Sequence, residues 1–188
     1  TGLSTTMDTA SNTAGEGVGY LSNFTLQVIL LTLTFLYLLI RNYDFKQLPI
    51  RWTWSLLFWV PFIFATVGLF GDLVTTLTGE YNYLNPALFA HIDSMEIIRK
   101  FLALSPMAIA YALLNGFYEE FFFLGLLTSV KEKNKWWVLL YSTIIRISFH
   151  TYQGLVWALV IGIVYGLFYY FLYKYKVKNL LPFFLMHA

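Results

Sequence analysis

Long apolar segments separated by short polar ones make up most of the chain after a polar start. Residues 1–23 are rich in Thr, Ser, Gly and Asn and show no apolar period, which is typical of a flexible polar N-terminal segment. The apolar segments cover residues 24–40, 52–76, 101–130, 136–150, 154–173 and 179–188. Since about 20 mostly apolar residues cross a bilayer as a helix, residues 24–188 predict an all-α, polytopic transmembrane helix bundle. It has about six spans, the last one truncated at Ala188.

The composition supports a membrane location. The chain has 188 residues, of which 59% are hydrophobic and 12% are charged, whereas a soluble domain carries about 25% charged residues. A fold of this length cannot bury so much apolar surface, so we expect lipid to cover the rest. The net charge of +2 and the absence of a basic, aromatic-rich stripe argue against a nucleic-acid partner. The chain has no cysteine, which excludes disulfides, thiol nucleophiles and cysteine-ligated metals.

The loops predict an orientation in the cell membrane. Lysine and arginine are concentrated in residues 41–51, 131–135 and 174–178. The loop at 79–100 between the second and third apolar segments is acidic as well as basic. Because cytoplasmic loops carry the excess of Lys and Arg, the three basic loops are predicted to face the cytoplasm and the 79–100 loop the other side. This alternation is consistent with a multi-pass protein.

Five ionisable residues interrupt the apolar segments. Glu119 and Glu120 lie in the third, Arg146 and His150 in the fourth, and His187 in the last. A charged side chain at the bilayer centre costs about 2.5–3.5 kcal/mol on insertion scales. We therefore expect these side chains to face the interior of the bundle and to find partners there.

The depths of these residues predict that they meet. Counted from the nearest basic loop at 1.5 Å per helical residue, Glu120 and Arg146 both lie about 16 Å from the cytoplasmic surface. On the same scale His187 lies about 14 Å and His150 about 22 Å from that surface. In a hydrocarbon core about 30 Å thick, three separate helices thus place polar groups in one slab. This coincidence predicts a shared polar site at mid-membrane depth.

Helical spacing separates the roles that these residues can take. Arg146 and His150 share one face of their helix, whereas Glu119 and Glu120 point about 100° apart and are expected not to face one partner. Glu120 with Arg146 is interpreted as a scaffolding ion pair, and Glu119 with His150 as functional. His187 could serve either function or interhelical hydrogen bonding. Two Glu and two His in a dry site could move protons, bind a metal or activate water.

Three segments carry these residues in motif-like order. They are Glu119–Gly125 (EEFFFLG), Arg146–Gly154 (RISFHTYQG) and Leu181–His187 (LPFFLMH). They resemble the three motifs of the CAAX protease and bacteriocin-processing family, the Abi or Ras-converting-enzyme-like intramembrane proteases. The first family motif is E-E-x-x-x-R, and the second and third each contain a His. The resemblance covers about residues 101–188, and the first two apolar segments are generic.

The resemblance implies a role for each matching residue. Glu119 and His150 would activate a water molecule that attacks a peptide carbonyl. His187, with an Asn or Asp one turn later and therefore beyond the end of the chain, would form the oxyanion site. Glu120 would orient the site by pairing with the motif arginine. All four residues are therefore candidate catalytic residues.

The chain departs from the family motif at the arginine. Leu124 occupies that position, so Glu120 lacks the usual partner on its own helix. Arg146 stands where the second motif commonly has Phe, at the same predicted depth as Glu120. We therefore expect Arg146 to supply the missing charge from the neighbouring helix as an ion-pair support.

Together these observations predict a glutamate-type intramembrane endopeptidase that cleaves a membrane-associated or lipidated peptide or protein. Its partners would be that substrate and the lipid bilayer. No H-E-x-x-H helix is present, so no metal or other cofactor is expected, with Zn²⁺ held by Glu and His as the alternative. Because the motif arginine is replaced, a catalytically inactive relative that acts as a membrane scaffold or regulator is an alternative function. A small transporter whose polar slab lines a path is another.

Overall fold

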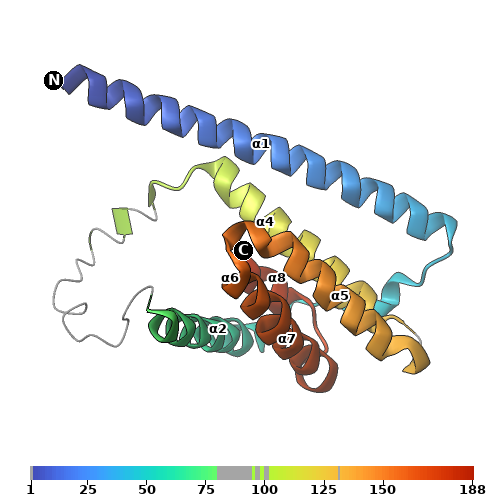
Figure 1. Cartoon of the computed structure of the whole chain (residues 1–188). Helices are drawn as coiled ribbons and strands as arrows, with labels where there is room; N and C mark the ends of the chain where they lie inside the picture. The colour runs from blue at the N-terminus through green and yellow to red at the C-terminus, as the bar shows by residue number, and fades with distance from the viewer. Residues whose placement is uncertain (1, 80–94, 96–97, 100–101, 131) are drawn as a thin grey trace.

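The computed structural model describes residues 2–79, 95, 98–99, 102–130 and 132–188, with side chains from residue 19 onward except that of Glu132. All regular elements in these residues are helical (Figure 1). The longer ones are α1 (Gly2–Ile40), α2 (Leu56–Thr78), α4 (Pro106–Glu120), α5 (Lys135–His150), α6 (Leu155–Leu159), α7 (Gly166–Leu172) and α8 (Leu181–His187). Three π-helical segments, η3 (Phe121–Leu126), η6 (Val160–Tyr165) and η7 (Tyr173–Val177), continue α4, α6 and α7, and the short 3-10 turns are η1 (Phe45–Gln47), η4 (Glu132–Asn134) and η5 (Thr151–Gln153).

The predicted all-α fold class is confirmed. Within the described residues the elements form six continuous helices, because α6, η6, α7 and η7 run on as one. In the part of the chain that the structure describes, three helices are long and apolar enough to cross a membrane: Gly19–Ile40, Leu56–Thr78 and Leu155–Val177. Large apolar side chains on them point away from the protein, as Leu57 and Leu69 do with 73% and 70% of their surface exposed. Such faces are suited to lipid rather than to water.

The N-terminal segment differs from the prediction in its backbone. Residues 1–23 were expected to be irregular and flexible, whereas α1 is helical from Gly2. Once a helix is nucleated, each further residue adds one hydrogen bond, so polar residues can continue a helix that an apolar segment stabilises. The flexibility of this segment stays a prediction.

The third helix begins later than residue 101, where the apolar segment starts. Ser105 is extended at ψ 143°, and its side chain accepts a hydrogen bond from the Ala108 backbone N–H at 3.1 Å. Proline disfavours helical backbone in the residue before it but is well tolerated at the first helical position. The Ser105-Pro106 step therefore starts α4. Most of the acidic 79–100 loop, including Asp93, lies outside the described residues.

Close contacts at two glycines hold the bundle together. Gly116 of α4 faces α8, and a Cβ there would lie 2.7 Å from the Phe184 carbonyl oxygen. Gly162 of η6 faces α5, where a Cβ would lie 3.1 Å from the Ile147 backbone nitrogen. Small residues permit such approach between helices that lack a hydrophobic driving force in lipid. As a result α8 packs against α4 and α2, and η6 packs against α5 (Figure 1).

The short helix α8 is anchored at its start. The Asn179 side chain donates to the Arg51 carbonyl at 2.7 Å and accepts from the Arg51 backbone N–H at 3.0 Å. The Leu180 backbone N–H donates to the Pro49 carbonyl at 2.9 Å. Asn179 and Leu180 are both buried. These bonds tie the beginning of α8 to the loop that follows α1, and thereby set the position of His187 at its other end.

Candidate active site

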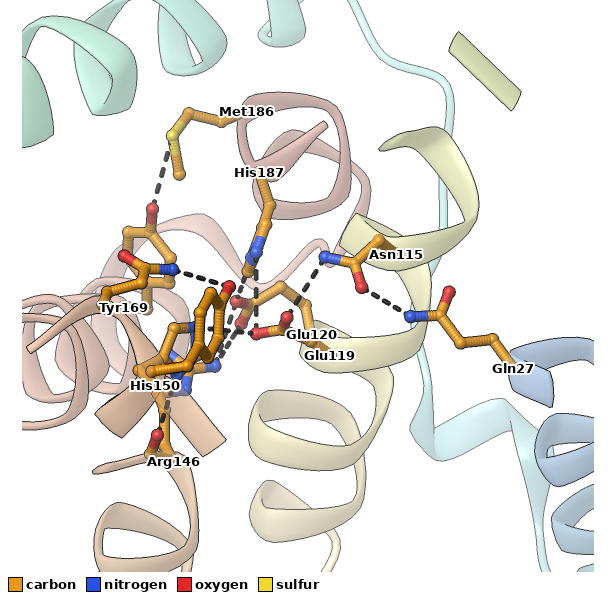
Figure 2. Close-up of polar contacts among 11 residues, drawn as sticks. Gln27, Asn115, Glu119, Glu120, Arg146, His150, Tyr169, Met186 and His187 are labelled. Carbon is orange, nitrogen blue, oxygen red and sulfur yellow. Dashed lines mark hydrogen bonds and ion pairs between the residues drawn. The ribbon is translucent and has the colours of Figure 1, made fainter. Parts of the chain in front are cut away.

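The two adjacent glutamates lie where α4 passes into the π-helical segment η3. Glu119 and Glu120 are the last residues of α4, and η3 begins at Phe121. A π-helical segment within an α-helix is frequently found at functional sites. Figure 2 shows side chains from α1, α4, α5 and α8 converging on this point.

Glu120 is completely buried and paired with a positive charge. Arg146 on α5 donates from Nη2 to both carboxylate oxygens of Glu120, each at 3.0 Å. The Arg146 guanidinium also lies 4.7 Å from the centre of the Phe123 ring. Burial of a charge is tolerated when a partner satisfies it. The geometry agrees with the ion pair inferred from the sequence, while its energetic contribution stays a prediction.

His187 contacts both glutamates, contrary to expectation. Its Nδ1 lies 2.9 Å from Glu120 Oε1, and its Nε2 lies 3.6 Å from Glu119 Oε2. The expectation that two adjacent glutamates cannot face one partner was wrong for this residue. The reason is that an imidazole presents nitrogens on two sides of its ring, so one side chain can reach two groups that point apart.

The orientation of His150 follows from its own helix. Its Nδ1 lies 2.8 Å from the carbonyl oxygen of Arg146, one turn earlier on α5. A carbonyl oxygen can only accept, so Nδ1 carries the hydrogen and, in a neutral ring, Nε2 presents its lone pair. This Nε2 lies 3.7 Å from Glu119 Oε2. The backbone of α5 therefore aims the free nitrogen of His150 at Glu119.

Glu119 has one satisfied oxygen and one that is not. Oε1 accepts a hydrogen bond from Asn115 Nδ2 at 3.1 Å. Oε2 is buried and has no hydrogen-bond partner in the part of the chain that the structure describes. It faces the Nε2 atoms of His150 and His187 at distances too long for direct hydrogen bonds. Acceptors gathered in this way require a hydrogen between them, which a water molecule or a mobile proton would supply.

A cavity of about 740 Å³ opens beside this group. Glu119 and His150 line it, whereas Glu120 and Arg146 do not. Its wall is formed by residues of α1, α4, η3 and α5, together with Leu127, Val130 and Tyr152. The apolar part of the wall includes Leu26, Leu30, Phe122, Phe123, Leu126, Leu127, Val130, Val138, Ile145 and Phe149. The site thus divides into a cavity-facing pair and a buried supporting pair.

Comparison with known proteins identifies the region that holds this site. Residues 101–188 match the family model described as type II CAAX prenyl endopeptidase Rce1-like. Residues 101–188 belong to this CAAX protease family. The matched region contains all five ionisable residues of the site, which are Glu119, Glu120, Arg146, His150 and His187. The match confirms the resemblance drawn from the sequence motifs. No curated protein and no solved structure matched the chain.

The Rce1-like family is a family of membrane proteases, which supports peptidase activity in general for this region. The helices α1 and α2 lie outside the matched residues. In the described residues no group of three or more His, Cys, Asp and Glu side chains is arranged to hold a metal ion. The absence of a cofactor requirement stays a prediction.

Sequence reasoning missed two uncharged residues of this site. Asn115 bonds Glu119, and Gln27 of α1 donates from Nε2 to Asn115 Oδ1 at 2.6 Å. Asn115 could have been found, because it lies one turn before Glu119 on the same face of the helix. Gln27 gave no comparable signal, since a single amide in an apolar segment does not reveal which helix it faces.

Proposed function

We propose that this chain is a glutamate-type intramembrane peptidase that cleaves a membrane-associated or lipidated peptide or protein. One observation carries the proposal. The buried Glu119 Oε2 lacks a hydrogen-bond partner among the described residues and faces imidazole nitrogens of His150 and His187. Glu119 and His150 also line a large cavity. A carboxylate and an imidazole aimed at one point are the groups that general acid–base catalysis needs to activate water.

In the proposed reaction, water binds between Glu119 Oε2 and His150 Nε2. Glu119 takes a proton from this water as the oxygen forms a bond to the peptide carbonyl carbon. The tetrahedral intermediate then breaks its C–N bond, and the proton held by Glu119 passes to the leaving amine nitrogen. The products are a new carboxyl end and a free amine, so no cofactor is consumed.

His187 and the ion pair would support this step. A protonated His187 could donate from Nε2 to the negative oxygen of the tetrahedral intermediate, since its Nδ1 is held by Glu120. Glu120 and Arg146 neutralise one another in the buried layer behind the cavity. We assign them the role of holding His187 and the α5 backbone in place.

The cavity and the loops suggest where a substrate would lie. The apolar wall from α1, η3 and α5 suits a lipid-linked or otherwise apolar chain, while the polar end holds Glu119 and His150. The basic loops 41–51, 131–135 and 174–178 would face the cytoplasm of a multi-pass cell-membrane protein. The bilayer and a peptide or protein substrate are the proposed partners, without nucleic acid.

Cleavage of a prenylated CAAX peptide in lipid nanodiscs tests the proposal, with the same peptide lacking the prenyl group measured alongside. Glu119→Gln and His150→Ala should each reduce kcat/KM by at least about a hundredfold, a range typical for removal of a general acid or base. Ser148→Ala, on the exposed side of α5, is the matched control and should leave cleavage unchanged.

The outcome also separates the alternatives. Near-normal turnover by either variant would show that the proposed water-activating pair is wrong. If the unmodified chain cleaves neither peptide, an inactive scaffold or regulator of a partner protein becomes the better reading. Ion flux in liposomes that is lost with Glu119→Gln would instead indicate a transporter.

A further inference from the structure

A chain of hydrogen bonds links α1 to the candidate active site. Gln27 Nε2 donates to Asn115 Oδ1 at 2.6 Å, and Asn115 Nδ2 donates to Glu119 Oε1 at 3.1 Å (Figure 2). All three residues line the cavity. These bonds join residues that are far apart in the sequence, because α1 packs along α4.

The direction of every bond in this chain is dictated by Glu119. An ionised carboxylate only accepts, so Asn115 must turn its NH₂ group toward Glu119 and its oxygen toward Gln27. Gln27 must then present its own NH₂ group to that oxygen. This orientation leaves Gln27 Oε1 buried without a hydrogen-bond partner among the described residues. An unsatisfied buried acceptor is costly. The orientation of Gln27 is therefore explained by the hydrogen bonds that Glu119 accepts and not by the surroundings of Gln27 Oε1.

We propose that Gln27 and Asn115 are positioning residues for Glu119. They hold Oε1 and thereby keep Oε2 directed at His150 and His187. The proposal rests on the proposed function for its consequence in catalysis, and on the hydrogen bonds for its geometry. It also assigns α1, which lies outside the family-matched residues 101–188, a part in the active site.

The isosteric variant Gln27→Glu tests this directly. In its ionised form, the form compared at alkaline pH, it places an oxygen against Asn115 Oδ1, so either two acceptors repel or the Asn115 amide turns over and faces Glu119 with its oxygen. The first result weakens the support of Oε1 and the second removes it, with little change in the shape of the side chain. Against the prenylated peptide, kcat should fall about tenfold or more with KM little changed, because positioning acts in the transition state. Gln27→Met, which leaves the bond from Asn115 to Glu119 intact, should cost less.

A double-mutant cycle separates positioning from packing. In an Asn115→Leu background, Gln27→Glu should have no further effect on kcat, since Gln27 acts through Asn115. Thr32→Val, on the exposed side of α1, is the matched control and should behave like the unmodified chain. Full activity of Gln27→Glu together with loss of activity in Glu119→Gln would overturn the positioning role of Gln27 and Asn115. The proposed function would still stand.

Thermal unfolding in detergent gives a readout that needs no activity. Gln27→Glu should lower Tm in the unmodified background and leave it unchanged in the Asn115→Leu background. If Tm decreases equally in both backgrounds, or in neither, Gln27 does not act through Asn115. This result would overturn the positioning role even if the chain proved not to be a peptidase.

Discussion

Glu120 and Arg146 are the most deeply buried charges that the structure describes. Their exposed fractions are 0% and 4%, and both oxygens of Glu120 receive a hydrogen bond from Arg146. His187 adds a third bond to Glu120. The family motif has its arginine at the position that Leu124 occupies here, in the same helix as Glu120. In this chain the positive charge is supplied by Arg146 from α5. The same requirement for a countercharge is thus met from a different helix.

Replacing one partner of this ion pair should destabilise the protein more than replacing both partners. Arg146→Leu removes the arginine from the buried carboxylate of Glu120 and leaves His187 as its remaining partner, which should cost up to about 3–5 kcal/mol of unfolding free energy. The combination of Glu120→Gln with Arg146→Leu should recover much of that loss. Unfolding in detergent followed by tryptophan fluorescence measures these two variants and the single variant Glu120→Gln, which completes the double-mutant cycle. Additive losses would show that the two side chains are not coupled.

Moving the arginine offers a second test of the same pair. Arg146→Phe together with Leu124→Arg places both motifs in their family form, with the charge one turn from Glu120 on its own helix. This double variant should be more stable than Arg146→Phe alone. If Leu124→Arg only lowers stability further, the position of Leu124 cannot serve Glu120 in this bundle.

At the scale of elements, the site depends on how closely α8 approaches α4. Gly116 has no side chain to separate the helices, and a Cβ there would meet the backbone at Phe184 of α8 and at Ala188, which follows α8. The other end of α8 is tied to the loop after α1 by Asn179. The backbone position of α8, which carries His187, is therefore set by one close contact and one anchor, neither of which is charged.

Gly116→Ala should disturb both stability and the site. The added Cβ would lie 2.7 Å from the Phe184 carbonyl oxygen, so α8 must shift. Overpacking of this kind typically costs about 1–3 kcal/mol, and displacement of His187 should lower kcat. The matched control is Gly68→Ala on α2, where a Cβ would meet nothing within 4 Å, and it should be neutral or mildly stabilising. Thermal unfolding and peptide cleavage measure the two variants, and equal behaviour of both would contradict the close-contact argument.

At the scale of the whole molecule, the absence of cysteine makes the predicted topology directly testable. Lys133→Cys should react with a membrane-impermeant maleimide only when the cytoplasmic side is accessible, because its loop is basic. Asp93→Cys should react only from the opposite side. Labelling of both positions from the same side would contradict the alternating arrangement of the spans.

The amino-acid sequence was sufficient to predict the helical class, the meeting of ionisable residues from three helices and the contact of Glu120 with Arg146. The physical reason is that these features have strong local signals. Apolar segments long enough for a bilayer must become helices to satisfy their backbone groups. A charge inside such a segment needs a partner at its own depth, and depth can be counted along each helix.

The detailed arrangement of the site could not be predicted without the three-dimensional fold. The contact of His187 with both glutamates, the bonds from Gln27 through Asn115 to Glu119, and the cavity beside them depend on the rotation and spacing of helices. Those are set by packing between distant segments, such as α8 against Gly116. Placing an amide side chain or a glycine in a membrane helix costs little free energy whichever neighbouring helix it faces. Its position in the sequence therefore does not show which neighbour it will contact.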